Sequence, residues 1–269
     1  MRPKSPSKRK IANTGFLGSW LTAALLDRGA AVVGLIRVRE PHSQLVRTGN
    51  IGRIEQVPGE LLDYELLKQV LTEKEIDTVF HLAGQTIVGV ANRDPAATFE
   101  TNIRGTWLLL EAVRHTPTVR GVVVASSEKA YGEQTSLPYL EDYPLQGRHP
   151  YEVSKSCADL IAQSFAHTFG LAIAVTRCSN LFGGGDLNWN RLIPGTIKSV
   201  LNGERPVIRS DGSFRRDYLY VADAVRGYLM LAENLTRPGV RGEPFNLGSG
   251  CAVTALEVVR TIVALSGKP

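Results

Sequence analysis

The chain has 269 residues, of which 43% are hydrophobic and 21% are charged. This length fits one large or two small domains with a core of useful size, and the composition excludes an intrinsically disordered chain. No run of about 18 apolar residues occurs, so the sequence predicts no membrane span. The cysteines Cys157, Cys178 and Cys251 are scattered, which argues against a disulfide framework or a cysteine metal site and is typical of the cytoplasm.

The positive charge is concentrated at the amino terminus. The formal net charge is +5, and residues 1–10 contain five basic residues and no acidic one. The remaining chain is balanced, with 26 basic and 26 acidic residues. A nucleic-acid-binding protein carries its charge as a patch on the folded domain. We therefore interpret residues 1–10 as a basic, disordered tail and expect no nucleic-acid partner.

Apolar runs alternate with helical patterns along residues 11–178. Four runs are almost continuously apolar, as in strands covered on both faces: residues 31–36, 78–83, 121–126 and 171–178. Four stretches have helical spacing or end signals: residues 18–28, 63–71, 96–115 and 150–167. This alternation predicts an α/β fold with a doubly wound parallel sheet, a Rossmann domain over residues 11–178.

The first expected helix opens with a glycine-containing turn, Thr14–Trp20. Gly15 and Gly18 let the backbone approach a pyrophosphate, and the helix N-terminus favours an anion. A full dinucleotide fingerprint has a further glycine where Ala12 stands. Residues 7–11, which should form the preceding strand, are mostly charged, so we expect that strand to be missing or degraded. A structural turn at a helix start is the alternative interpretation.

The residue at the end of the second strand distinguishes the two nicotinamide cofactors. An acidic residue there binds the ribose hydroxyl group of NAD, whereas an arginine accepts the 2′-phosphate of NADP. The strand over residues 31–36 is followed by Arg37, and no acid precedes Glu40. This pattern favours NADP, and two solvated arginines are the alternative.

A tyrosine and a lysine lie four residues apart at the start of the helix expected at 150–167. Tyr151 and Lys155 share a helix face, and an ammonium beside a tyrosine lowers the pKa of its hydroxyl, which makes it a base near neutral pH. Ser127 follows the strand over residues 121–126, at the end where open α/β sheets bind ligands, and is expected to bind the same substrate oxygen. The same spacing at Tyr64 and Lys68 lacks this context and is interpreted as an ordinary exposed helix.

The pattern changes after Cys178. Glycines at 183–185, 195, 203 and 212, together with several prolines, predict a loop-rich substrate lobe over residues 179–269. Helical spacing returns at about 217–232, so we expect this segment to rejoin the Rossmann domain and the two parts to be interleaved.

Several motifs resemble those of the extended short-chain dehydrogenase/reductases. They occur in that family's order: TGFLGSW at 14–20, FHLAGQ at 80–85, FETNIRGT at 99–106, SSEK at 126–129 and YEVSK at 151–155. The stretches 126–129, 145–158 and 180–194 are most similar to the nucleotide-sugar 4,6-dehydratases, especially the CDP-glucose type. Members of the family continue for several tens of residues past the position of Pro269, so we expect the substrate lobe to be truncated.

The resemblance implies a redox-neutral dehydration of a sugar nucleotide that uses a tightly held NAD or NADP. Tyr151 would take the proton of the C4 hydroxyl, Glu128 would protonate the leaving C6 hydroxyl, and Lys129 would remove the C5 proton. These roles require that Glu128 keeps a proton and that Lys129 gives one up near neutral pH. A surface Glu–Lys pair is the alternative interpretation.

The resemblance also assigns binding residues. The implied cofactor residues are Gly15, Phe16, Leu17, Gly18, Arg37, Glu60, Leu61, Leu82, Ala83, Gln85, Asn102, Tyr151 and Lys155. The implied substrate residues are Asn180, Arg191 and Arg216, and an ion pair with Asp217 at a helix start is the alternative for Arg216. His81, inside an apolar strand, is interpreted as a core residue, and no metal site is expected.

Two other functions stay open. A sugar-nucleotide epimerase would use the same Tyr151 and cofactor, but the CDP-sugar epimerases with a lysine at position 129 carry an amide before it, so Glu128 favours dehydration. A non-catalytic relic or binding module is suggested by the altered phosphate loop. Relatives dimerise through helices like those at 96–115 and 150–167, so we expect a cytoplasmic homodimer.

Overall fold

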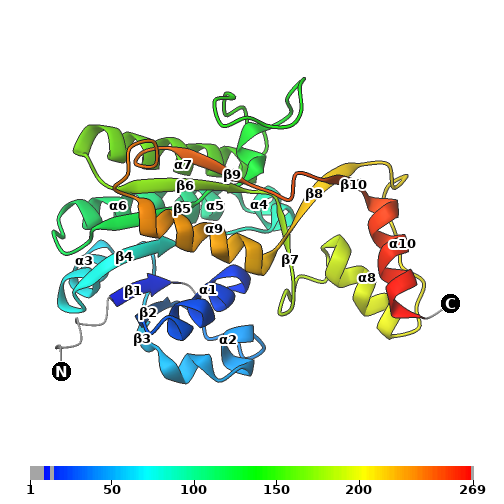
Figure 1. Cartoon of the computed structure of the whole chain (residues 1–269), viewed down its shortest axis with the longest axis horizontal. Coiled ribbons are helices and arrows are strands. Elements are labelled where there is room, and N and C mark those ends of the chain that lie inside the picture. Colours follow the sequence, from blue (N-terminus) through cyan, green and yellow to red (C-terminus); the bar gives the residue numbers. More distant parts are fainter. Residues whose placement is uncertain (1–8, 13–14, 268–269) are drawn as a thin grey trace.

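The computed structural model describes residues 9–12 and 15–267 (Figure 1). Residues 1–8 of the expected tail, and Asn13 and Thr14 of the expected phosphate loop, lie outside the described residues. In chain order the elements are β1 (Arg9–Ala12), α1 (Phe16–Asp27), β2 (Ala31–Ile36), α2 (Gln44–Arg47), η1 (Asn50–Arg53), β3 (Glu55–Pro58), α3 (Tyr64–Glu73), β4 (Ile76–His81), α4 (Val88–Arg93), α5 (Pro95–Phe99), η2 (Glu100–Arg104), α6 (Gly105–Arg114), β5 (Gly121–Ala125), η3 (Glu128–Tyr131), α7 (Pro150–Phe169), β6 (Ile173–Cys178), β7 (Asn180–Phe182), α8 (Leu192–Leu201), β8 (Arg215–Tyr220), α9 (Val221–Asn234), β9 (Pro244–Leu247), β10 (Ala252–Thr254) and α10 (Ala255–Ser266).

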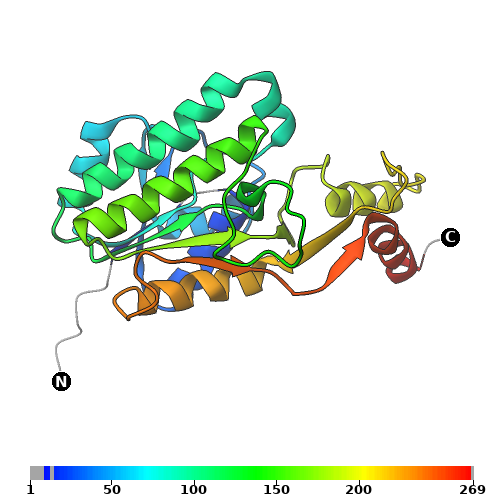
Figure 2. The same ribbon diagram turned by 90° about the horizontal axis from the view of Figure 1, so that it is seen from above.

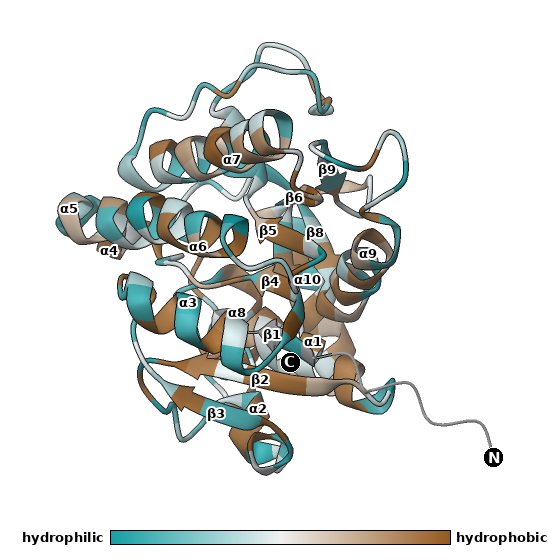
Figure 3. Cartoon of the chain, turned by 90° about the vertical axis from the view of Figure 1, so that its left-hand side faces the viewer, coloured by the Kyte–Doolittle hydropathy of each residue, from teal (hydrophilic) through white to brown (hydrophobic). Residues whose placement is uncertain are grey.

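The larger of the two sheets in the described part of the chain has seven parallel strands in the order β3-β2-β1-β4-β5-β6-β9. Side chains alternate across a strand, so Val122 and Val124 of β5 pack with α3, α6 and α7, while Val123 packs with α1 and α9 on the other face. Figure 2 shows helices on both faces, and Figure 3 shows the mostly hydrophobic strands between them. The predicted doubly wound α/β fold is confirmed.

The first strand, which the sequence led us to expect missing or degraded, is present as the central strand β1. It pairs in parallel with β2 on one side and β4 on the other. The Lys10 ammonium donates to the Thr78 hydroxyl at 3.1 Å and lies 3.6 Å from the Asp77 carboxylate, so this charge is partnered within the sheet. The expectation was wrong because flanking strands, rather than the apolar content of a short segment, decide whether the segment pairs. Arg9 and Lys10, assigned to the tail, belong to β1.

The substrate lobe is built on a second sheet. Strand β8 pairs in parallel with β7 and antiparallel with β10, and α8 packs against α10 beside this sheet (Figure 1). Residues 217–220, which were expected to be helical, belong to β8. The chain then returns to the large domain from Val221 to Leu247, further than the expected 217–232, because α9 packs on α1 and β9 pairs with β6.

The long helix α7 is fixed at both ends by local sequence signals. Pro150 stands in the first turn, and the Glu152 carboxylate accepts hydrogen bonds from the backbone N–H groups of Arg148 at 3.0 Å and His149 at 3.2 Å. Gly170 ends the helix in the left-handed conformation, with φ of 68°. Within residues 9–12 and 15–267, no helix has the length and apolar character required to cross a membrane.

Candidate active site

The carboxyl ends of β4, β5 and β6 bring the expected site residues to one edge of the large sheet. Residues 82–85 follow β4, Ser127 and Glu128 follow β5, and Asn180 follows β6. Parallel strands end at the same edge, which is where open α/β sheets bind their ligands. Helix α7 crosses behind this edge and supplies Tyr151 and Lys155 from its first two turns.

Tyr151 and Lys155 are both buried, at 8% and 6% exposure, on one face of α7. The Ser127 side chain lies close enough to Tyr151 to lower the pKa of the Tyr151 hydroxyl. The Lys155 ammonium donates to the backbone oxygen of Ala125 at 2.8 Å, which fixes it against the end of β5.

The pKa values of this pair differ from the simple expectation. Burial raises the pKa of Tyr151, and the nearby Ser127 side chain and the charge of Arg191 only partly oppose it. Burial also lowers the pKa of Lys155 to about 8. We expected Lys155 to lower the pKa of Tyr151; loss of water around the hydroxyl is instead the largest effect, because both groups lie in the protein interior.

Glu128 and Lys129 begin the short helix η3, which Ser127 caps by accepting a hydrogen bond from the Lys129 backbone N–H at 3.2 Å. The Glu128 carboxylate is half-buried and accepts a hydrogen bond from the Asn180 side chain at 3.0 Å. Burial raises the pKa of Glu128, with the charges of Lys129 and Arg216 opposing it. A raised pKa is the property that a general acid needs near neutral pH.

Asn102 is fully engaged by protein groups. Its side-chain oxygen accepts from the Gln85 backbone N–H at 2.7 Å, and its nitrogen donates to the Gln85 backbone oxygen at 2.9 Å and to the Ser154 hydroxyl at 2.8 Å. It stands in a π-helical turn, η2, between α5 and α6, where we expected one continuous helix. Asn102 therefore ties the loop after β4 to α7 beside Lys155.

The loop after β4 passes close to this side chain. A Cβ atom on Gly84 would lie 3.0 Å from the Asn102 side-chain oxygen and 3.7 Å from the Lys155 ammonium. Leu82, Ala83 and Gln85 are half-buried around it. A side chain at residue 84 would therefore crowd the Asn102 side chain.

The start of α1 fits an anion. Gly15 is the exposed N-cap, no side chain caps the helix there, and a Cβ on Gly15 would meet no atom within 4 Å. The positive end of a helix beside open space suits a pyrophosphate. Phe16, Leu17 and Gly18 form the first turn.

The other expected cofactor residues lie at the ends of β2 and β3. Arg37 and Glu60 are exposed, so both side chains are accessible to a ligand. Leu61 instead packs into the core, where a Cβ on Gly105 would lie 2.4 Å from its methyl group. Its side chain is therefore used to hold α6 against the residues that follow β3.

The three expected substrate residues approach from the lobe. Asn180, in β7, joins Glu128 to the backbone oxygen of Asp217 at 3.2 Å. Arg191 stands just before α8 and pairs with Asp186 at 3.0 Å. Arg216, in β8, is exposed and close enough to Glu128 for its charge to lower the pKa of that carboxyl group.

The helix-start ion pair considered for Arg216 does not describe the structure. Arg216 donates to the backbone oxygen of Arg215 at 2.8 Å and stands in a strand. The Asp217 carboxylate instead accepts from the backbone and hydroxyl of Ser249, at 3.0 and 2.6 Å, and from the Gly250 backbone at 3.1 Å. Arg216 therefore remains available to a ligand.

His81 is a satisfied core residue, as expected. Thr106 donates its hydroxyl proton to the Asn102 backbone oxygen at 2.6 Å, so it accepts from His81 Nε2, 2.9 Å away, and the ring carries its proton on that nitrogen. Burial, with a smaller effect of the Lys155 charge, lowers the pKa of His81 to about 3. In the described ranges, no three His, Cys, Asp or Glu side chains gather in a way that could hold a metal ion.

Sequence reasoning missed two groups near the site. Arg177 and Asp159 form a buried ion pair behind η3, and Trp20 of α1 reaches Gly184 of the lobe. Arg177 had a signal, since it is a lone charge in the apolar strand β6. Trp20 had none, because its partner is 164 residues away.

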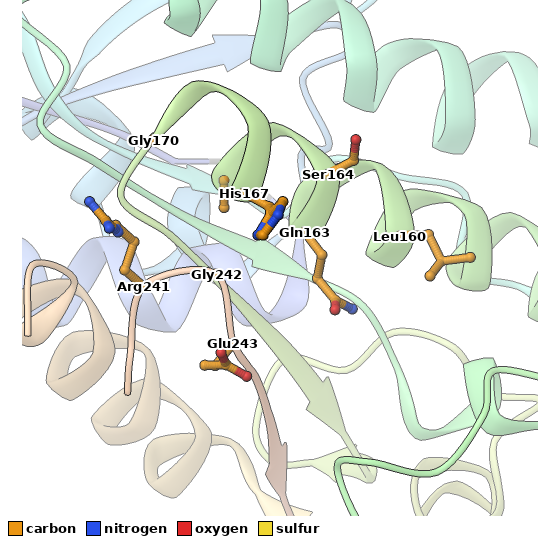
Figure 4. Close-up of a pocket in the computed structure, with 9 residues that line it drawn as sticks. Leu160, Gln163, Ser164, His167, Gly170, Arg241, Gly242 and Glu243 are labelled. Carbon is orange, nitrogen blue, oxygen red and sulfur yellow. The ribbon is translucent and has the colours of Figure 1, made fainter. Parts of the chain in front are cut away.

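A cavity of about 510 Å³ lies away from these residues (Figure 4). Its lining comes from the second half of α7 and from residues 241–243, and includes Gln163, His167 and Arg241. None of the expected site residues contributes to it. The cavity is therefore separate from the candidate active site.

The chain is similar to known proteins over most of its length. Residues 13–248 match the family described as "NAD dependent epimerase/dehydratase family". A CDP-glucose 4,6-dehydratase of Salmonella typhimurium is 34% identical over 250 residues, which are 88% of this chain and 69% of that protein. Two solved structures have a TM-score of 0.86. The first is a dTDP-glucose 4,6-dehydratase of Streptomyces venezuelae with NAD bound, which is 28% identical, with 97% of this chain and 82% of that one covered. The second is a UDP-glucose 4-epimerase of Thermotoga maritima with UDP-glucose, which is 25% identical, with 97% of this chain and 83% of that one covered.

Proposed function

The chain belongs to the NAD-dependent epimerase/dehydratase family, and on that basis we propose that it is a nucleotide-sugar 4,6-dehydratase of the CDP-glucose type. The product would be a 4-keto-6-deoxy sugar nucleotide. The observation that carries the proposal is the half-buried Glu128 carboxyl group, which burial keeps at a raised pKa next to Lys129. An epimerase acting at C4 does not need this acid.

The cofactor is NAD or NADP, held tightly and regenerated in each turnover. Gly15 and the first turn of α1 would hold the pyrophosphate, and the exposed Arg37 would lie near the adenosine ribose. Lys155, beside Gly84, would help to hold the cofactor. When bound, the cofactor would supply hydride chemistry between C4 and C6 of the sugar, with no net oxidation over a turnover.

The protein residues move the protons. Tyr151 accepts the proton of the C4 hydroxyl as the C4 ketone forms, with Ser127 close enough to the Tyr151 hydroxyl to lower its pKa. The ketone acidifies the C5–H bond, and Lys129 removes that proton. Glu128 donates its proton to the C6 hydroxyl, which leaves as water across C5 and C6. Arrival of the hydride at C6 and return of a proton to C5 complete a net loss of one water.

Substrate binding involves both parts of the molecule. Asn180, Arg191 and Arg216 come from the lobe, and the guanidinium groups suit the two phosphates of a sugar nucleotide. We also propose a homodimer through α6 and α7, where Trp107 and Leu160 are 39% and 57% exposed. Light scattering on the purified protein would measure its mass in solution, and a monomer would contradict the dimer.

Mass spectrometry tests the function. The purified protein, with NAD and NADP added, is incubated in parallel with CDP-glucose, GDP-mannose, dTDP-glucose and UDP-glucose. We expect a product lighter by one water, first of all from CDP-glucose. A product of unchanged mass but altered chromatographic retention would instead establish an epimerase. If neither the mass nor the retention of any sugar nucleotide changes, the protein is not an active enzyme on these substrates. Thermal stabilisation by NAD or NADP would then distinguish a binding module from a relic without a cofactor site.

A further inference from the structure

A bidentate ion pair lies in the core directly behind the candidate active site. Arg177 of β6 donates from Nε and Nη2 to the two carboxylate oxygens of Asp159 in α7, at 2.8 and 3.0 Å. The side chains are 3% and 0% exposed. Burying two charges has a large desolvation cost, and an apolar pair of similar volume is often at least as stable. The buried Arg177–Asp159 pair therefore indicates that the relative position of β6 and α7 has to be fixed.

The third guanidinium nitrogen of Arg177, Nη1, binds the end of η3. Arg177 Nη1 donates to the Tyr131 hydroxyl at 2.8 Å and to the Glu141 backbone oxygen at 2.8 Å, and the guanidinium carbon lies 4.8 Å from the centre of the Tyr131 ring. Burial raises the pKa of Tyr131, so its hydroxyl keeps a proton, which it donates to Asn246 at 2.8 Å. Tyr131 is completely buried and is the last residue of η3.

The ion pair thus connects α7, which carries Tyr151 and Lys155, with η3, which carries Glu128. Asp159 follows Tyr151 and Lys155 at successive four-residue steps along α7, and its charge acts on Lys155. Tyr131 ends the single helical turn that begins with Glu128. A short turn of this kind has few internal hydrogen bonds, so its position depends on its anchors.

We propose that Asp159, Arg177 and Tyr131, here called the Arg177 network, are positioning residues that hold η3, and with it the acid–base pair Glu128 and Lys129, in register with Tyr151 and Lys155 on α7. The inference rests on the proposed function, since it concerns the water-loss step. Displacement of catalytic groups by about 1 Å can reduce a rate by about a hundredfold. Loosening the network is therefore expected to slow water loss while oxidation at C4 continues.

The decisive variant is Tyr131→Phe, which keeps the buried ring and removes the hydroxyl. The protein with bound cofactor is mixed with CDP-glucose, and two signals are followed: the absorbance of reduced nicotinamide, which reports oxidation at C4, and the mass of the product, which reports water loss. We expect water loss to slow by about tenfold or more and oxidation to change by less than about twofold. Tyr143→Phe, at a half-buried tyrosine outside the network, is the matched control.

A double-mutant cycle with Glu128→Gln separates positioning from general stability. If Tyr131 acts through Glu128, adding Tyr131→Phe to Glu128→Gln produces little further loss, because the two effects are not additive. Water loss at the wild-type rate in Tyr131→Phe, or equal slowing of both steps, would overturn the inference alone. Absence of water loss in the wild type would overturn the proposed function and the inference with it. If Tyr131→Phe does not fold, Arg177→Lys, which keeps the charge opposite Asp159, must show the same selective loss.

Discussion

Asn180 donates a hydrogen bond from its side-chain nitrogen to a carboxylate oxygen of Glu128, 3.0 Å away. The two residues are 52 positions apart and come from β7 and η3, so the contact joins the substrate lobe to the large domain. Asn180 also donates to the backbone oxygen of Asp217. The proposed acid is therefore oriented by the same residue that is expected to bind the substrate.

Replacing Glu128 by glutamine tests the acid. A glutamine oxygen can still accept the hydrogen bond from Asn180, so the local geometry is kept, but the amide N–H is too weakly acidic to transfer a proton to a leaving hydroxyl. We expect Glu128→Gln to slow water loss by about a hundredfold to ten-thousandfold, as for loss of a general acid. Glu133→Gln, the same change at an exposed residue, is the control. Water loss at an unchanged rate in Glu128→Gln would refute the role of the acid.

Replacing Tyr151 by phenylalanine tests the base at C4. Loss of its hydroxyl removes the acceptor of the C4 proton, and we expect oxidation at C4 to slow by about a hundredfold or more. The chain contains its own control in Tyr64 and Lys68, which have the same spacing on α3. Tyr64→Phe should leave the rate unchanged, as measured by the absorbance of reduced nicotinamide. Equal effects of the two substitutions would contradict the role of Tyr151 as the base.

The buried His81 predicts a dependence of stability on pH. Its pKa is about 3 in the folded chain and near 6.5 when unfolded, so the unfolded chain binds a proton first as the pH falls below 6.5. Stability due to the neutral ring is complete above pH 6.5 and is lost toward pH 3, at up to about 1.4 kcal/mol per pH unit.

Urea unfolding at pH 6.5, 5.5 and 4.5 measures this slope. His81→Gln keeps a donor for Thr106 but does not titrate, so we expect a flatter dependence of the unfolding free energy on pH than in the wild type. His42→Gln, at an exposed histidine, should retain the wild-type slope. The same slope in all three proteins would show that His81 is not responsible.

Trp20 links the cofactor helix to the lobe. Its indole N–H donates to the Gly184 backbone oxygen at 2.8 Å, and its ring meets Tyr220 edge-on at 5.9 Å. Trp20→Phe removes the donor and keeps an aromatic ring. Because a hydrogen bond contributes about 1 kcal/mol, we expect the Kd of the sugar nucleotide to rise by about fivefold and that of NAD to change less. Calorimetric titration measures both, and an unchanged Kd for the sugar nucleotide would count against the link.

Local patterns were sufficient for much of the fold. Strand β2 coincides with the expected residues 31–36, and α7 begins at Pro150 as expected. A continuous apolar run or a proline in a first turn acts within a few residues, so the sequence carries it directly. The shared face of Tyr151 and Lys155 also follows from helical periodicity alone.

Partners distant in sequence decided the rest. Strand β1 forms in a charged segment because β2 and β4 lie on either side, and β9 joins the large sheet beside β6 although their first residues, Pro244 and Ile173, are 71 positions apart in the chain. The pairing of β1 and of β9 depends on the positions of other strands, and a short window of sequence does not contain that information.

The sequence by itself determined the α/β architecture, the family and the residue types of the candidate site. Only the tertiary structure decided that Asn180 meets Glu128, that Arg177 and Asp159 pair inside the core, and that burial raises the pKa of Tyr151 where a neighbouring charge was expected to lower it. The physical reason is that burial and contact between distant residues arise when the chain packs, and desolvation in the packed state sets the proton affinity of each group.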